Sequence, residues 1–113
     1  NPGTVAAVIF RQAAVPALFF GLGERGKPAE SVADDAADEA IRFRDSGCPV
    51  DPHSADQLLL PLAFSADAAE YRTAEVTRHL KTNIATVRKF VDRGMSVDAE
   101  EGRPGTVRVA AVV

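Results

Sequence analysis

The sequence predicts an α/β protein, an α+β two-layer sandwich in which a mixed β-sheet carries helices on one face. Two observations predict this class. Short apolar runs of strand character alternate along the chain with stretches of helical periodicity, and two apolar segments near the end flank a turn rich in glycine and proline. With 113 residues the chain is long enough for one modest domain, so we expect residues 1–113 to form a single domain.

The first part of the chain predicts two strands. Residues 4–10 (TVAAVIF) form an apolar, β-branched run that suits a buried strand, and residues 17–20 predict a second strand. Pro16 breaks the interval between them. A glycine-rich turn follows over residues 21–27.

The clearest helix begins after Pro28, a residue that the first turn of a helix tolerates because its missing N–H has no partner there. Gly47 supplies a C-terminal stop. The opposite face of this helix is acidic, which is most simply a solvated surface. The apolar positions recur at helical spacing, at residues 29, 32, 33, 36, 37, 40 and 41.

The second half predicts two helices, a strand and a hairpin. Asp51-Pro52 begins a short helix that Pro61 ends or kinks, and Thr77 caps a longer helix that Gly94 stops. Between the helices we expect a loop over residues 65–70 and a strand over residues 71–76. Residues 95–99 and 106–113 predict a closing hairpin.

Composition excludes several classes of protein. A net charge of −3 excludes nucleic-acid binding through a broadly basic surface, so RNA contacts would need local clusters. The single Cys48 excludes an internal disulfide and fits a reducing compartment, which predicts a cytoplasmic protein. We expect no membrane partner because no apolar run is long enough. Two histidines and one cysteine at these separations predict no zinc site.

His79 is the candidate catalytic residue. It lies one or two residues into the helix after Thr77, where free backbone N–H groups and the helix dipole favour a phosphate. An imidazole held neutral there is a nucleophile. Taken alone, the same residue is an ordinary solvent-facing histidine, so the remaining motifs decide between the two interpretations.

Three motifs in this order and spacing resemble the RNA 3′-terminal phosphate cyclase family: GERGKPAE at residues 23–30, DQLLLPLA at 56–63 and HLKTN at 79–83. The resemblance covers roughly residues 21–109 and corresponds to about the last third of such an enzyme. It implies that this chain is the C-terminal portion, the last βαβαββ unit, of a fold that resembles the C-terminal domain of translation initiation factor three. The start at Asn1 also favours a piece of a longer protein.

The resemblance implies a ligase-type nucleotidyl transfer. Members use ATP, with magnesium as the expected metal, to form a histidine–AMP adduct and then activate an RNA 3′-phosphate, which closes to a 2′,3′-cyclic end. It places the adduct on His79 and puts Asp56 and Gln57 beside the nucleotide, with His53 near the adenine. The metal ligands would lie elsewhere in the parent chain, so we expect the piece alone to be weakly active or inactive.

The charged turn before the first helix is a further candidate site. Arg25 and Lys27 match the charge of an RNA phosphate, although glycines that shape a tight turn with charges in water explain the same residues. The turn also has the form G-x-G-x-x-G, but no acidic residue follows at the distance that a dinucleotide site requires.

Two other functions compete with the enzyme. A non-catalytic cyclase-like factor in ribosomal RNA processing would share the fold but lack the histidine of the HLxTN motif, which is present here as His79. An interaction domain of this size is the other alternative. The expected partners are ATP, RNA 3′-phosphate ends and the remainder of the parent chain, and exposed strand edges favour self-association.

Overall fold

The computed structural model describes residues 3–11 and 14–112 of the chain. The chain divides into two compact units, Asn1–Gly47 and Cys48–Val113. That residues 1–113 form a single domain stays a prediction.

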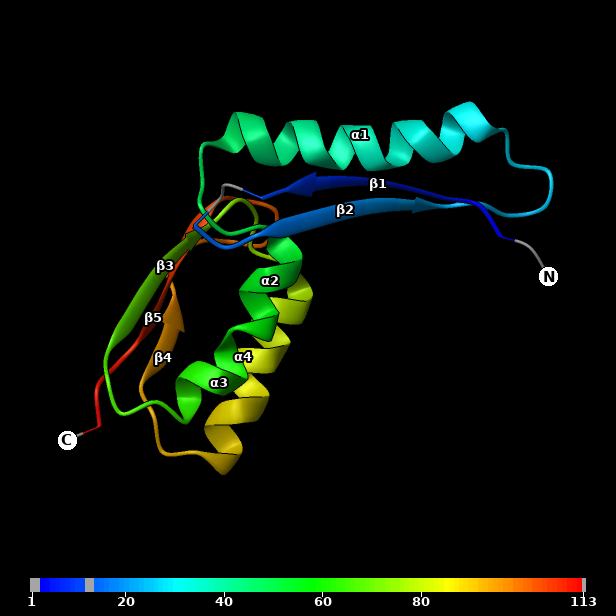
Figure 1. Ribbon diagram of the computed structural model, residues 1–113. Helices are drawn as coiled ribbons and strands as arrows, with labels where there is room; N and C mark the ends of the chain where they lie inside the picture. Colours follow the sequence, from blue (N-terminus) through cyan, green and yellow to red (C-terminus); the bar gives the residue numbers. More distant parts are fainter. Residues whose placement is uncertain (1–2, 12–13, 113) are drawn as a thin grey trace. The chain divides into compact units, whose positions relative to one another are not determined.

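The first unit is a two-stranded antiparallel sheet with one long helix on its face (Figure 1). Strand β1 (Val5–Phe10) pairs with β2 (Ala17–Leu22), and helix α1 (Ala29–Ser46) covers them. The helix ends at Gly47, which adopts the left-handed conformation (φ 66°) that glycine tolerates best. The predicted helix and its stop are therefore confirmed.

Successive side chains of β2 point to opposite faces of the sheet, and this alternation decides which of them contact α1. Ala17, Phe19 and Gly21 are buried, while the residues between them are exposed. Phe19 and Phe43 of α1 lie with ring centroids 5.4 Å apart, and Phe10 completes the cluster with edge-on contacts to both rings. Small alanines on α1 let the helix approach the sheet closely.

The outer face of this sheet is apolar and open. In the register of the two strands, Val5 lies opposite Leu22 and Ile9 opposite Leu18. These four side chains and Phe20 are each at least half exposed. Alternation explains this face, because a strand residue that does not point at α1 must point away from it.

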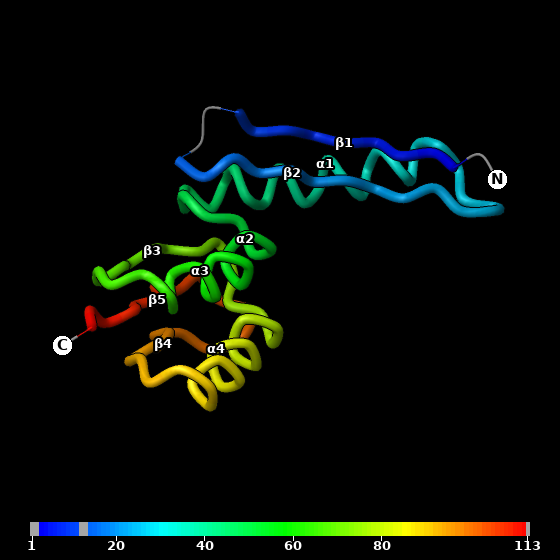
Figure 2. The backbone as a smooth tube through the Cα atoms, turned by 60° about the horizontal axis from the view of Figure 1, so that its bottom comes forward, coloured from blue at the N-terminus to red at the C-terminus, as the bar shows by residue number. Residues whose placement is uncertain are grey.

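The second unit is a three-stranded antiparallel sheet with three helices on one face (Figure 1). Figure 2 shows β5 running between β3 and β4. The elements in chain order are α2 (Pro52–Gln57), α3 (Leu59–Ala63), β3 (Ala69–Thr73), α4 (Arg78–Phe90), β4 (Met95–Val97) and β5 (Gly105–Val109).

A fully buried core joins these two layers. Leu59 of α3, Leu80 of α4 and Val107 of β5 have no exposed surface. The helix starts are capped as the sequence predicts: Asp51 accepts from the N–H groups of His53 and Ser54, and the Thr77 hydroxyl accepts from Leu80 N at 3.1 Å.

A buried arginine holds the loop after α3 against the end of the sheet. Arg93 is 7% exposed, and its guanidinium donates only to backbone carbonyls among the described residues. The acceptors are the carbonyl oxygens of Leu62, Ala63, Ser65, Asp67 and Ala110. Two of them end helix α3, where the helix dipole favours a positive charge.

The predicted class is confirmed, with a correction to the sheet. The strands form two antiparallel sheets in place of one mixed sheet, and the parallel pairing described is the single bridge of Val50 with Thr73. Each unit carries its helices on one face, as predicted (Figure 1).

Some element boundaries differ from the prediction for physical reasons. The strand expected at residues 71–76 begins at Ala69, opposite Val109, and ends at Thr73. Beyond it Val76 N donates to Arg103 O at 2.7 Å, outside the ladder. The final strand ends at Val109, and Val113 lies outside the described residues. The helix expected to end or kink at Pro61 is interrupted earlier, at Leu58, and continues through Pro61 to Ala63. Pro61 has no N–H to donate to Gln57.

Candidate active site

His79 is the second residue of α4, two residues after the Thr77 cap and within the first turn of the helix. Its side chain is 93% exposed, so the imidazole is accessible to a ligand. The first N–H groups of a helix have no intrahelical partner, and α4 is long enough, from Arg78 to Phe90, to carry a macrodipole. The position therefore suits an anion next to the ring.

Asp56 brings a carboxylate to the same place from another helix. It lies in the last turn of α2, with its side chain 22% exposed, and its Oδ2 is 3.8 Å from His79 Nδ1. That separation is within ion-pair range and longer than a hydrogen bond. The carboxylate therefore acts on the ring through its charge and favours a proton on the nearer nitrogen, Nδ1.

A hollow of about 400 Å³ is lined in part by this pair. It follows one face of α4, because residues three, four and seven positions after His79 share its side of the helix. Its lining consists of Asp56, Arg78, His79, Thr82, Asn83 and Thr86. The guanidinium of Arg78 lies 3.6 Å from Glu101 and is 84% exposed, so the pair is a weak surface contact.

Two side chains support the turn that carries Asp56. The Asn83 amide donates to the carbonyl of Asp56 at 3.0 Å, and the Tyr71 hydroxyl donates to the carbonyl of Ala55. Burial raises the pKa of Tyr71 well above its ordinary value, and the negative charge of Asp56 raises it further. Tyr71 therefore stays a hydrogen-bond donor across the physiological range.

The structure places the other predicted nucleotide residues outside this hollow. His53 and Gln57 lie on α2 with exposed side chains, and neither lines the space that Asp56 and His79 line. Their role stays a prediction.

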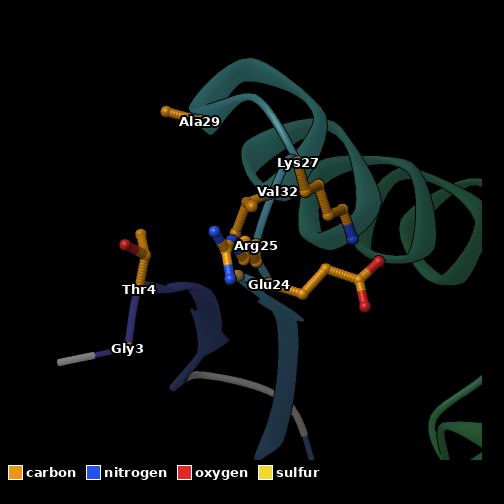
Figure 3. A pocket seen from close by; sticks show the side chains of 8 residues that line it. Gly3, Thr4, Glu24, Arg25, Lys27, Ala29 and Val32 are labelled. Carbon is orange, nitrogen blue, oxygen red and sulfur yellow. The ribbon is translucent and has the colours of Figure 1, made fainter. Parts of the chain in front are cut away.

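Arg25 and Lys27 line a separate hollow in the first unit, of about 610 Å³ (Figure 3). Figure 3 shows their nitrogen atoms pointing to different sides of it. The Lys27 ammonium already pairs with the Asp35 carboxylate and donates to Leu22 O at 3.3 Å. Lys27 thus joins the turn to both α1 and β2, and a phosphate would have to compete with Asp35 for it.

The described residues contain no group of three histidine, cysteine, aspartate or glutamate side chains that could hold a metal ion. Within the same ranges, no helix is long and apolar enough to cross a membrane.

The sequence interpretation missed several residues of the site. Thr82 and Asn83 belong to the HLKTN motif without an assigned role, and Thr86 continues the polar face one turn further. Helical spacing from His79 is the signal that could have found them. Tyr71 carries no such signal, because its hydrogen bond joins β3 to α2.

The geometry defines a class of site: an accessible imidazole at a helix start, with a carboxylate beside one ring nitrogen. Comparison with known sequences supplies the family. The family model described as RNA 3′-terminal phosphate cyclase matches residues 3–97, and this chain belongs to that family. The prediction of the family is confirmed, and the match extends closer to the start of the chain than the motifs did.

Curated relatives agree with this assignment. An RNA 3′-terminal phosphate cyclase of Thermococcus kodakarensis is 45% identical over 92 residues, which is 81% of this chain and 26% of the relative. One of Trichormus variabilis is 46% identical over 72 residues, 64% of this chain and 21% of the relative. A third, from Ectopseudomonas mendocina, is 42% identical over 92 residues, which is 81% of this chain and 27% of the relative. The chain therefore spans about a quarter of the length of these relatives.

Proposed function

We propose that this chain is the nucleophile-bearing part of an ATP-dependent RNA 3′-terminal phosphate cyclase. The substrate is an RNA 3′-phosphate end, as the name of the relatives says of them, and the product is a 2′,3′-cyclic phosphodiester. The observation that carries the proposal is the 3.8 Å separation of His79 Nδ1 and Asp56 Oδ2 at the start of α4 in a member of this family.

In the first step the lone pair of His79 Nε2 attacks the α-phosphorus of ATP. A nitrogen–phosphorus bond forms, the bond to the pyrophosphate oxygen breaks, and its electron pair leaves with pyrophosphate. Positive charge develops on the imidazole, and the Asp56 carboxylate near Nδ1 stabilises it. The amides at the start of α4 and the Arg78 guanidinium face the phosphate charge.

The second and third steps transfer the activated group. An oxygen of the RNA 3′-phosphate attacks the AMP phosphorus and releases His79, which gives an RNA adenylate. The neighbouring 2′-hydroxyl then attacks the 3′-phosphorus, loses its proton and expels AMP. Splitting the activation in this way replaces one difficult displacement by easier ones.

The remaining site residues have supporting roles in the proposal. Asp56 and Gln57 contact the nucleotide, His53 packs near its base, and Arg25 and Lys27 hold RNA phosphate. A divalent metal, magnesium, would neutralise charge on the phosphates of ATP, held mainly by residues of the parent chain outside this piece. Because the chain spans about a quarter of its relatives, we expect little cyclisation by it alone.

Location and assembly complete the proposal. The protein acts in the cytoplasm, together with the rest of its parent chain. Two features support self-association. The outer face of β1 and β2 is apolar and exposed, and among the described residues each of these two strands has one edge without a partner strand.

The test is to incubate the full-length parent with magnesium and ATP labelled at the α-phosphate. We expect acid-labile, protein-bound label that His79→Ala abolishes. Lys81→Ala is the matched control, because Lys81 is an exposed residue of the same helix that does not line the hollow. Label that survives in His79→Ala would overturn the proposal, and a parent that takes no label would favour the non-catalytic ribosomal RNA processing factor.

A further inference from the structure

The junction between α2 and α3 is an interrupted helix, and two carbonyl groups in the last turn of α2 accept hydrogen bonds from side chains of other elements. Helix α2 ends at Gln57 and α3 begins at Leu59, with Leu58 between them. The last carbonyls of a helix lack intrahelical partners, and Pro61 has no N–H to offer Gln57. The turn that carries Asp56 is therefore held by groups from other elements.

Two side chains from different elements supply such donors to neighbouring carbonyls. The Tyr71 hydroxyl, from β3, donates to Ala55 O, and the Asn83 amide, from α4, donates to Asp56 O at 3.0 Å. One anchor comes from the sheet and the other from the helix that carries His79. Together they restrict rotation and translation of the last turn of α2.

Restricting this turn matters because the contact between Asp56 and His79 weakens if the two side chains move apart. Asp56 Oδ2 is 3.8 Å from His79 Nδ1, and the attraction between such groups falls as they separate and water enters between them. The His79 ring is 93% exposed, so it has few packing contacts of its own to fix it against Asp56. The geometry of the pair depends on the α2 turn.

We propose that Tyr71 is a positioning residue of this site: its hydroxyl, acting with Asn83, holds the last turn of α2 so that Asp56 faces His79 Nδ1 and Nε2 is left as the nucleophile. Tyr71 touches neither the reacting atoms nor the hollow around them. The inference deepens the proposed adenylation of His79 and rests on it only where activity is measured.

The first test does not involve activity. Nitrogen-15 NMR of the full chain reports which ring nitrogen of His79 carries the proton. Tyr71→Phe removes one oxygen and keeps the ring. We expect it to raise the fraction of His79 in the Nε2–H tautomer, and we expect Asp56→Asn to raise the same fraction. Asn83→Ala removes the second anchor, should shift the fraction likewise, and decides the question if Tyr71→Phe fails to fold.

A control separates positioning from general loss of stability. Val107 lies opposite Tyr71 in the sheet and is fully buried, so Val107→Ala weakens the same strand pair without removing a donor to α2. We expect Val107→Ala to lower the unfolding temperature and leave the tautomer fraction unchanged. A tautomer shift in Val107→Ala equal to that in Tyr71→Phe would overturn the proposal.

The second test measures adenylation in the full-length parent. Tyr71→Phe should lower the rate of His79 labelling at saturating ATP by about fivefold, the value of one typical hydrogen bond, with KM for ATP changed less than about twofold. An unchanged tautomer fraction and rate in Tyr71→Phe would overturn the positioning role. If the unmodified parent takes no label, the proposed function fails, and the tautomer comparison still decides the role of Tyr71.

Discussion

His79 Nδ1 lies 3.8 Å from Asp56 Oδ2, although the two residues belong to different helices, α4 and α2. The carboxylate faces one ring nitrogen, so the two nitrogens are not equivalent. A proton is favoured on Nδ1, and Nε2 keeps its lone pair. The fold thereby selects the ring nitrogen that reacts in the proposed adenylation.

Removing the charge of Asp56 should slow adenylation moderately. At 3.8 Å the attraction is about 1 kcal/mol in water and about 4 kcal/mol at a partly buried site. Because His79 is 93% exposed, the lower value applies, and Asp56→Asn should reduce the labelling rate roughly fivefold. Rapid-quench measurement of the label checks this, and a rate equal to that of the unmodified parent would contradict it.

The raised pKa of Tyr71 predicts that the protein loses stability at alkaline pH. Burial and the Asp56 charge raise its pKa in the folded state, whereas in the unfolded chain it titrates near 10. Above pH 10 the unfolded state therefore binds fewer protons than the folded state. The contribution of the Tyr71 hydroxyl to the free energy of unfolding is complete below pH 10 and declines as the pH rises, by at most about 1.4 kcal/mol per pH unit.

Urea unfolding of the chain and of Tyr71→Phe at several alkaline pH values measures this contribution. The difference between their free energies of unfolding should shrink as the pH rises. Tyr71 is the single tyrosine of the chain, so tyrosinate absorbance reports its titration without assignment. Equal pH dependence in the two proteins would show that the hydroxyl titrates normally in the folded state.

Arg93→Met should destabilise the second unit strongly. The substitution keeps an apolar stem but removes every guanidinium donor to the five carbonyl oxygens, of which Leu62 O keeps a backbone donor, Ser65 N–H. Leaving buried carbonyls unsatisfied costs about 2–4 kcal/mol in total, after relaxation and entry of water. Chemical denaturation measures this loss.

Arg88→Met is the matched control for Arg93→Met, because Arg88 is exposed on α4. It should change the free energy of unfolding by less than about 0.5 kcal/mol. Similar losses in the two variants would mean that the loss of charge matters and the carbonyl contacts do not.

Gly21→Ala should destabilise the first unit because α1 approaches β2 closely at this residue. A Cβ at this position would overlap the backbone carbonyl of Val32, which cannot move without displacing the helix. Gly3→Ala is the control, since a Cβ there meets nothing within 4 Å. We expect a loss of about 1–3 kcal/mol for Gly21→Ala and almost none for Gly3→Ala, measured by denaturation.

Local patterns predicted the elements whose stability is local. The helical spacing of α1, its stop at Gly47 and the Thr77 cap of α4 depend on neighbours in the sequence. The structure confirms the helix, its stop and the cap, whereas positions 29, 33 and 41 of the expected apolar stripe are exposed. The strand expected at residues 71–76 was displaced because its ends depend on pairing with β5, a segment distant in the chain. The expected mixed sheet was wrong for the same reason, since strand direction is decided by pairing.

The motifs by themselves determined the family and the candidate nucleophile, because the spacing of GERGKPAE, DQLLLPLA and HLKTN is a property of the sequence. Only the tertiary structure decided which residues accompany His79. It brought Asp56 to Nδ1, left His53 and Gln57 outside the hollow, and engaged Lys27 with Asp35. These contacts join different elements, and their distances are set by the packing of α2 on α4 and of the turn on α1, which sequence spacing does not encode.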